Sequence, residues 1–144
     1  MIAVDTNILV YAHREELPFH AVADRCITSL AEGAAAWAIP WPCIHEFLST
    51  VTRPRLFDPP TPLTVALDHI DYLLQSPTLV LLTESDQHWQ QLRAMMISGQ
   101  VTGPRVPDAR IAALCQQHGI RELWSADRDF SRFPELRVVN PLVA

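Results

Sequence analysis

The chain has 144 residues, the size of one ordinary domain, so we expect a single domain over residues 1–144. Hydrophobic residues make up 49% and charged residues 19%, as in soluble globular proteins, and no apolar run approaches the ~18 residues of a membrane span. All eleven basic residues are arginine, and the lack of lysine excludes P-loop nucleotide sites and Schiff-base chemistry. Three widely spaced cysteines, and a first segment without a basic cluster, predict free thiols in the cytoplasm.

The first third of the chain alternates short apolar runs with helical patterns. A strand is predicted over residues 1–4, where the apolar run ends at an aspartate. A helix around residues 23–30 has apolar residues at helical spacing and is stopped by Gly33. A second strand is predicted over residues 37–39. A helix opened by Pro42 then follows and ends before Pro54.

The middle of the chain begins with a proline-rich segment over residues 53–62, which we expect to be an exposed loop. Thr61 is expected to cap the next helix. The inward side chains of that helix are predicted to be Leu63, Leu67, Ile70 and Leu74. A strand is predicted over residues 78–83. Ser85 is expected to cap a helix that ends at Gly99, with Trp89, Leu92 and Met96 facing inward.

The last third contains a turn-rich connection, one helix and two strands. The helix is expected to open at Asp108 and to stop at Gly119, and the strands are predicted over residues 122–125 and 136–139. Strands that alternate with helices imply a mostly parallel sheet of about five strands between two helical layers, a three-layer α/β domain. Ligands of such sheets bind beyond the carboxyl ends of the strands.

Acidic residues fall where predicted elements begin or end. Asp5 closes the first strand, Asp127 follows the fourth, and Asp108 stands at a helix start. Each also has a structural interpretation: Asp5 and Asp108 as helix caps, and Asp127 with Asp129 as turn formers. Helical periodicity points Glu46 away from the apolar stripe of its helix, which favours a solvated glutamate.

A carboxylate cluster without lysine, and without Cys or His at ligand spacing, suits a hard cation bound through oxygen. Mg²⁺ fits best, with Mn²⁺ as a substitute. None of the six histidines has H-x-H or H-E-x-x-H spacing, so we expect no histidine ligand. Hard cations with open coordination positions usually act on phosphates.

Four short segments stand in order along the chain: 4–12 (VDTNILVYA), 45–48 (HEFL), 107–113 (PDARIAA) and 125–130 (SADRDF). Each alone is weak, but in this order and in a chain of this size they resemble PIN-domain ribonucleases, specifically the VapC-type toxins of bacterial toxin–antitoxin pairs. The resemblance implies a PIN-like fold and a Mg²⁺-dependent endoribonuclease whose products carry 5′-phosphate and 3′-hydroxyl ends. It also implies an RNA substrate, a cognate antitoxin and a homodimer.

The resemblance also assigns residues. It implies Asp5, Glu46, Asp108 and Asp127 as catalytic acids, with Asp5, Asp108 and Asp127 as metal ligands. Thr6, Ser125 and Asp129 would support them. Ser125 departs from the threonine more frequent in the family but keeps the hydroxyl. The resemblance places Glu46 in the cleft, against the solvent position that periodicity indicates.

The net charge of −5 would normally discourage an RNA partner. Without the five acids assigned to the site, eleven acids balance eleven arginines. Four arginines near the elements of the predicted cleft are candidates to hold phosphates, with ordinary solvated side chains as the alternative: Arg53, Arg55, Arg105 and Arg110.

The tryptophans have two interpretations. Trp89 lies on a helix stripe and Trp124 in a strand, so both are expected in the core. Trp37 and Trp41, next to the helix that carries Glu46, could form an exposed apolar surface for a partner. Met95 and Met96 are expected in the core or at a subunit interface.

Two other functions compete with RNA cleavage. An aspartyl-phosphate phosphatase or receiver domain would also use Asp5 beside a parallel sheet, but the families with that chemistry use a lysine, which this chain lacks. A non-catalytic α/β module that binds RNA or protein, equivalent to a degenerate PIN domain, stays open because sequence alone does not show that the acids converge.

Overall fold

The computed structural model describes residues 1–143, which form one all-parallel sheet of five strands with helices on both sides. The strands are β1 (Ile2–Val4), β2 (Trp37–Pro40), β3 (Leu79–Leu82), β4 (Glu122–Trp124) and β5 (Arg137–Val139). The α-helices are α1 (Thr6–His13), α2 (His20–Glu32), α3 (Trp41–Val51), α4 (Leu63–Leu74), α5 (His88–Ser98) and α6 (Val106–Gln117). Two short 3₁₀ helices complete the structure, η1 (Gly103–Arg105) and η2 (Arg128–Arg132).

The strand order β3-β2-β1-β4-β5 places β1 at the centre of the sheet. From β1 the chain builds outward through β2 to β3, then crosses back to β4 and β5 on the other side of β1. The order therefore reverses between β1 and β4, where Val4 is in register with Trp124. Such a reversal opens a crevice at the carboxyl ends of the two strands, and this crevice positions the site.

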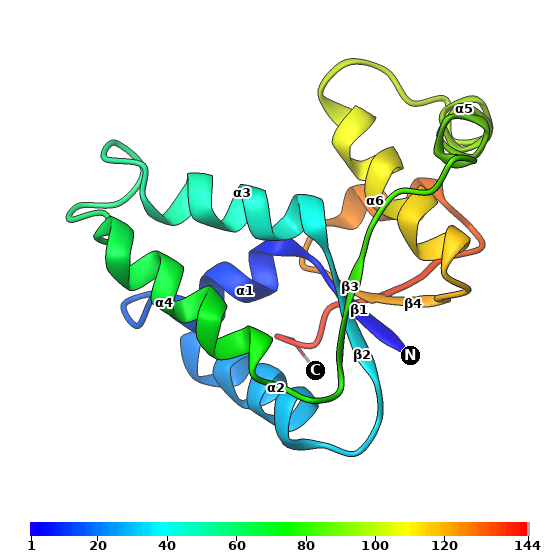
Figure 1. Cartoon of the computed structure of the whole chain (residues 1–144). Helices are drawn as coiled ribbons and strands as arrows, with labels where there is room; N and C mark the ends of the chain where they lie inside the picture. The colour runs from blue at the N-terminus through cyan, green and yellow to red at the C-terminus, as the bar shows by residue number, and fades with distance from the viewer. Residues whose placement is uncertain (144) are drawn as a thin grey trace.

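Figure 1 shows α1, α2 and α4 on one side of the sheet and α5 and α6 on the other. Helix α1 packs on α2 and α3, and α5 packs on α6. The sheet and α6 supply much of the core, in which Val4, Trp37, Leu114 and Leu123 are fully buried. Within residues 1–143, no helix has the length and hydropathy that a membrane span requires.

Prolines and one glycine fix the ends of the helices that carry the site. Pro42 and Pro107 lie in the first turns of α3 and α6, where a missing N–H leaves no hydrogen bond unmade. Gly119 follows α6 with a φ of 70°, a conformation that glycine adopts without strain. The Ile120 N–H then donates to the Cys115 carbonyl, which ends the helix and turns the chain toward β4.

The predicted strands and the three-layer α/β architecture are confirmed, but several local predictions are wrong. Helix α6 begins at Val106, so Asp108 lies within its first turn and is not its cap. Helix α5 begins at His88; Ser85 instead accepts a hydrogen bond from the Gln87 N–H in the preceding turn. Thr61 does not cap α4, because its hydroxyl contacts two side chains of the segment that ends α1.

Two tryptophans and one helix face also differ from expectation. Trp37 is fully buried, with its Nε1 donating to Ser76 Oγ at 3.2 Å, whereas Trp89 is 63% exposed on α5, a helix without a buried residue. Trp124 is partly buried and packs against the core, as expected. Helix α4 buries Ala66, Ile70 and Leu73, so the predicted inward residues Leu63, Leu67 and Leu74 are exposed.

Leu114 on α6 offers a direct test of this core. It is fully buried, so Leu114→Ala should lower the free energy of unfolding by about 2–5 kcal/mol, measured by chemical denaturation. The matched control is Trp89→Ala on α5, which should change it by less than about 0.5 kcal/mol because the side chain is exposed. Equal effects of the two substitutions would contradict the packing described here.

Candidate active site

Asp5 lies at the carboxyl end of the central strand and is only 6% exposed. It is the N-cap of α1, and its Oδ1 accepts a hydrogen bond from the Thr6 N–H at 2.8 Å. The Cys43 thiol of α3 donates to the same oxygen at 3.5 Å. The capping interpretation of Asp5 is therefore correct, and it does not compete with a functional one, because the second carboxylate oxygen faces the end of β4.

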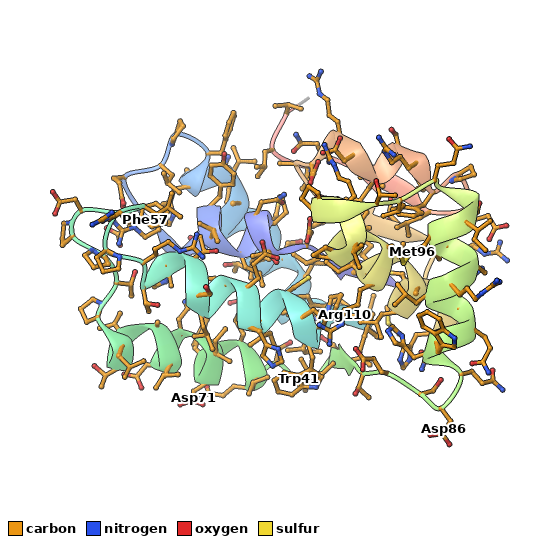
Figure 2. The ribbon with its side chains drawn as sticks, turned by 90° about the horizontal axis from the view of Figure 1, so that it is seen from above. Trp41, Phe57, Asp71, Asp86, Met96 and Arg110 are labelled. Carbon is orange, nitrogen blue, oxygen red and sulfur yellow. The ribbon has the colours of Figure 1, made fainter. Side chains whose placement is uncertain are left out.

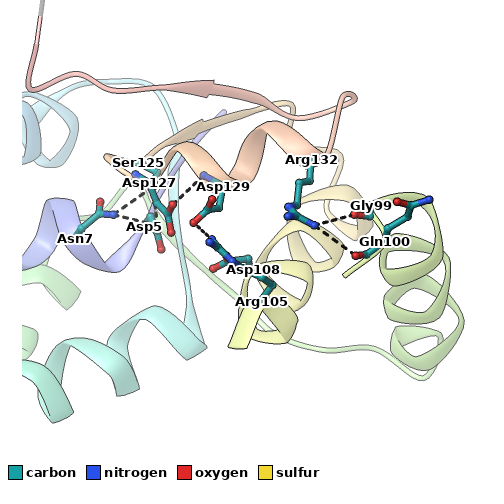
Figure 3. A network of polar contacts seen from close by, with 10 residues as sticks. All are labelled: Asp5, Asn7, Gly99, Gln100, Arg105, Asp108, Ser125, Asp127, Asp129 and Arg132. Atoms are coloured by element: carbon teal, nitrogen blue, oxygen red, sulfur yellow. Dashed lines mark hydrogen bonds and ion pairs between the residues drawn. The ribbon is translucent and has the colours of Figure 1, made fainter. Parts of the chain in front are cut away.

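Two side chains connect Asp5 to the segment after β4 (Figure 3). The Ser125 hydroxyl donates to Asp5 Oδ2 at 2.7 Å and accepts from the Asp127 N–H at 3.0 Å. Asn7 donates to Asp5 Oδ2 and to Ser125 Oγ, and its Oδ1 accepts from the Ala126 N–H at 3.1 Å. The ends of the two strands are therefore joined by side-chain hydrogen bonds beyond the sheet itself.

Asp108, Asp127 and Asp129, here called the acid cluster, each offer a carboxylate oxygen, and these oxygens all lie within 4.8 Å of one another. Asp108 comes from the first turn of α6, and the other two flank the start of η2. Asp127 Oδ1 accepts from the Asp129 N–H at 2.9 Å, so Asp127 is also the turn former that its sequence context predicts.

Glu46 reaches the site from α3. The Thr6 hydroxyl donates to Glu46 Oε2 at 3.3 Å, which joins α1 to α3 beside Asp5. The residue is exposed, as periodicity indicates, and it also lines the cavity that contains Asp5. Its exposed face is therefore the face that looks into the cleft.

A cavity of about 350 Å³ connects these groups. One side is lined by Asp5, Glu46, Asp108 and Asp127. The rest of the lining, here called the apolar wall, includes Val10, Tyr11, Leu17, Phe57 and Ile111. The cavity therefore combines carboxylates with side chains that suit a flat, apolar group.

Arg14, the residue after α1, holds the proline-rich loop against this cavity. Its guanidinium lies 4.4 Å from the centre of the Phe57 ring, donates to the Pro59 carbonyl at 3.0 Å and donates to Thr61 Oγ1 at 3.2 Å. These three contacts fix the position of Phe57 in the apolar wall.

The crowding of carboxylates in a partly dehydrated site shifts their proton affinities. Burial raises the pKa of Asp5 above its ordinary value of 3.8, although hydrogen bonds from Ser125, Thr6 and Cys43 lower it. Burial, and then the neighbouring charge of Asp127, raises the pKa of Asp108 to about 6. Arg105 opposes this shift through its positive charge. The site therefore favours a bound cation, which would relieve the repulsion.

The chemistry of the donors fits a hard divalent ion. The ligand atoms offered are carboxylate oxygens, as Mg²⁺ and Mn²⁺ prefer. Asp108, Asp127 and Asp129 meet the distance expected of groups that share one ion. Asp5 lines the same cavity as Asp108 and Asp127.

The four arginines that the sequence analysis proposes as phosphate contacts differ in whether an acid already pairs with them. Arg105 forms ion pairs with Asp129 and, at 3.9 Å, with Asp108. Arg53 and Arg55 lie exposed in the loop that carries Phe57, whereas the Arg110 guanidinium donates to Glu84.

Sequence reasoning assigned no role to Asn7 or to Cys43. A polar residue two positions after Asp5, just before the apolar run 8–10, was a signal for Asn7. Nothing in the sequence pattern pointed to Cys43.

The chain is similar to known proteins over nearly its whole length. The PIN domain family model matches residues 2–136. The chain is 34% identical over 142 residues to Ribonuclease VapC43 of Mycobacterium tuberculosis, an alignment that covers 99% of this chain and 96% of the relative. The chain belongs to the PIN domain family. Its relatives within this family include VapC ribonucleases.

Solved structures show the same fold as this PIN domain. VapC20 of Mycobacterium tuberculosis, a toxin that cleaves the sarcin-ricin loop, superposes with a TM-score of 0.68 at 18% identity, covering 91% of this chain and 93% of that one. VapBC2 of Rickettsia felis, solved bound to a DNA fragment from its promoter, gives 0.66 at 20% identity, with coverage of 96% and 98%.

The raised pKa of Asp108 makes the stability of this PIN domain depend on pH. Its folded-state pKa lies above the ordinary 3.8, so ionisation costs the folded state free energy above about pH 6, and this cost disappears as the pH falls through 6 toward 3.8. In metal-free buffer, Asp108→Asn should therefore raise the free energy of unfolding at pH 7.5 by about 1 kcal/mol, less than the full linkage value because solvent screens a partly exposed carboxylate. Denaturation at pH 3.8 should show no difference, and a gain of equal size at both pH values would contradict the assignment.

Substitution of Ser125 tests whether its hydroxyl orients the Asp5 carboxylate. Ser125→Ala removes the 2.7 Å hydrogen bond to Asp5 and should weaken Mn²⁺ binding by about tenfold in a calorimetric titration, a typical loss for a group that orients a ligand. Ser125→Thr keeps the hydroxyl and should retain most of the affinity. Equal affinities of the wild type and Ser125→Ala would show that this hydroxyl does not orient Asp5 toward a metal.

Proposed function

We propose that this protein is a metal-dependent endoribonuclease that hydrolyses RNA phosphodiesters and is the toxin of a type II toxin–antitoxin pair. Membership of the PIN domain family, with VapC ribonucleases as relatives, supports the reaction class. One observation carries the assignment to residues: Asp5, Glu46, Asp108 and Asp127 come from four separate parts of the chain and line one cavity.

The residues divide into ligands and supports. Asp5, Asp108 and Asp127 are the proposed metal ligands, and Mg²⁺ is the proposed ion, with Mn²⁺ as a substitute. Thr6 and Ser125 orient Glu46 and Asp5 through their hydroxyls. A bound divalent ion would supply a Lewis acid for the scissile phosphate and lower the pKa of an attacking water.

The chain itself supplies proton transfer and placement. Hydrolysis joins the oxygen of water to phosphorus and breaks the P–O3′ bond, so one product ends in a 5′-phosphate and the other in a 3′-hydroxyl. Glu46, the exposed acid of the cavity, is placed to take up the proton that the water loses. Asp129 assists by completing the acid cluster.

The two kinds of side chain that line the cavity fit the two parts of a nucleotide. With a phosphate at the acids, the adjoining base would lie toward Tyr11 and Phe57, since single-stranded RNA is commonly held by stacking on aromatic side chains. Arg53 and Arg55 on the Phe57 loop, and Arg105 beside the acid cluster, are the arginines proposed to contact the backbone. Arg110 stays a weaker candidate because Glu84 holds it.

The proposed partners follow from the same assignment. A toxin of this kind requires a cognate antitoxin, and we place its inhibitory segment over the cavity, where it would exclude RNA. The homodimer that the family resemblance implies stays a prediction, as does a location in the cytoplasm, with which the three free thiols agree.

The function is tested by incubating a structured RNA pool with the antitoxin-free protein in Mg²⁺ or Mn²⁺, in EDTA, and with Asp5→Asn. Cleavage should depend on the metal and fall by at least about a hundredfold in Asp5→Asn, because the variant loses a ligand charge. Sequencing of the fragments should show 5′-phosphate ends.

The matched control is Asp71→Asn, which removes the same charge from an exposed residue of α4 at the margin of the molecule (Figure 2). It should cleave like the wild type. Full activity in Asp5→Asn would contradict the assigned site. A folded wild-type protein that binds Mn²⁺ but cuts no RNA would favour a non-catalytic binding module.

A further inference from the structure

Arg105 places a positive charge within the group of acids proposed to hold a metal. Its guanidinium pairs with Asp129 and lies 3.9 Å from Asp108 Oδ2, so it contacts two of the three members of the acid cluster (Figure 3). The side chain is 37% exposed, as is that of Asp129. The pair is therefore open to solvent and can exchange.

Apart from these contacts, the Arg105 guanidinium lies in an electrostatically unfavourable position. Arg105 is the N-cap of α6 and makes no side-chain capping hydrogen bond. A positive charge at this end of a helix is opposed by the helix dipole, which favours anions there. The attraction of the acids therefore holds the guanidinium in place.

Contacts other than those of Arg105 also help to place the members of the acid cluster. The Asp129 N–H is held by Asp127 Oδ1 at 2.9 Å, and Asp108 is fixed in the first turn of α6. The backbone that carries Asp108 and Asp129 is thus placed without the guanidinium. When the guanidinium leaves, the acids lose one compensating positive charge.

We propose that Arg105 is a positioning residue that acts as an exchangeable counter-cation: it offsets one negative charge of the acid cluster in the metal-free protein and is displaced by the divalent ion, which frees its guanidinium for a phosphate of the RNA. This inference rests on the proposed metal-dependent function. Displacement is required because the guanidinium and the ion compete for the oxygens of Asp108 and Asp129, and because two cations at this distance repel each other.

Calorimetric titration with Mn²⁺ tests the exchange without relying on cleavage. Arg105→Gln should bind Mn²⁺ about three- to tenfold more tightly than the wild type, because the competing charge is gone. Arg105→Lys keeps the charge and should bind with an affinity between the two. The melting temperature of metal-free Arg105→Gln should fall, and saturating Mn²⁺ should restore it to the wild-type value.

Arg110→Gln is the matched control. Arg110 also lies on α6 and pairs with an acid, Glu84, with a side-chain exposure of 42%, but it does not contact the acid cluster. Its removal should leave Mn²⁺ affinity unchanged. Equal or weaker Mn²⁺ binding by Arg105→Gln, while the wild type binds, would overturn the exchange and leave the metal site intact. Absence of Mn²⁺ binding by the wild type would overturn the proposed site and the exchange together.

The salt dependence of RNA binding tests whether the displaced Arg105 guanidinium contacts a phosphate. The affinity of the wild type and Arg105→Gln for the structured RNA pool is measured in saturating Ca²⁺ over a range of KCl concentrations. Loss of one phosphate contact should reduce the slope of log affinity against log salt by about 0.7–0.9. An unchanged slope would overturn the phosphate contact and with it the exchange as proposed.

Discussion

The Asp5 carboxylate is almost inaccessible to water. The free-energy cost of burying this charge determines which groups surround it. Its hydrogen-bond donors come from α1, from α3 and from the end of β4. The contacts that make the charge tolerable therefore also fix the elements that bring Glu46 and Asp127 into place. Because the strands are parallel and their order reverses beside β1, these elements open toward the same crevice.

The strand ends could be predicted because they depend on local pattern, whereas the grouping of the four acids came from the resemblance to PIN-domain ribonucleases. Short apolar runs ending in Asp5 and Ser125 need burial, and a parallel sheet then aligns their carboxyl ends. Glu46 shows the limit of periodicity: the pattern correctly indicates that it leaves the core. Only the packing of α3 against α1 decides that the solvent it meets is the cleft.

The remaining differences arise where tertiary contacts override a local pattern. Trp37 lies in β2, all four residues of which are buried, whereas Trp89 lies on α5, which has no buried residue. Helix α4 is rotated from its leucine stripe so that Ala66 faces inward. The bonds of Asn7 to the β4 segment span more than a hundred residues of sequence, and no local signal specifies such a pair.

Separate contacts hold the acids of the cavity and its apolar wall. Asp5 and Asp127 are fixed at the sheet edge and Asp108 by α6, whereas Phe57 is fixed by Arg14, which reaches from the end of α1 to the loop at three points. Substitutions in this loop can reshape one wall of the cavity while the carboxylates stay in place. The shape of the cavity can therefore vary independently of its charge.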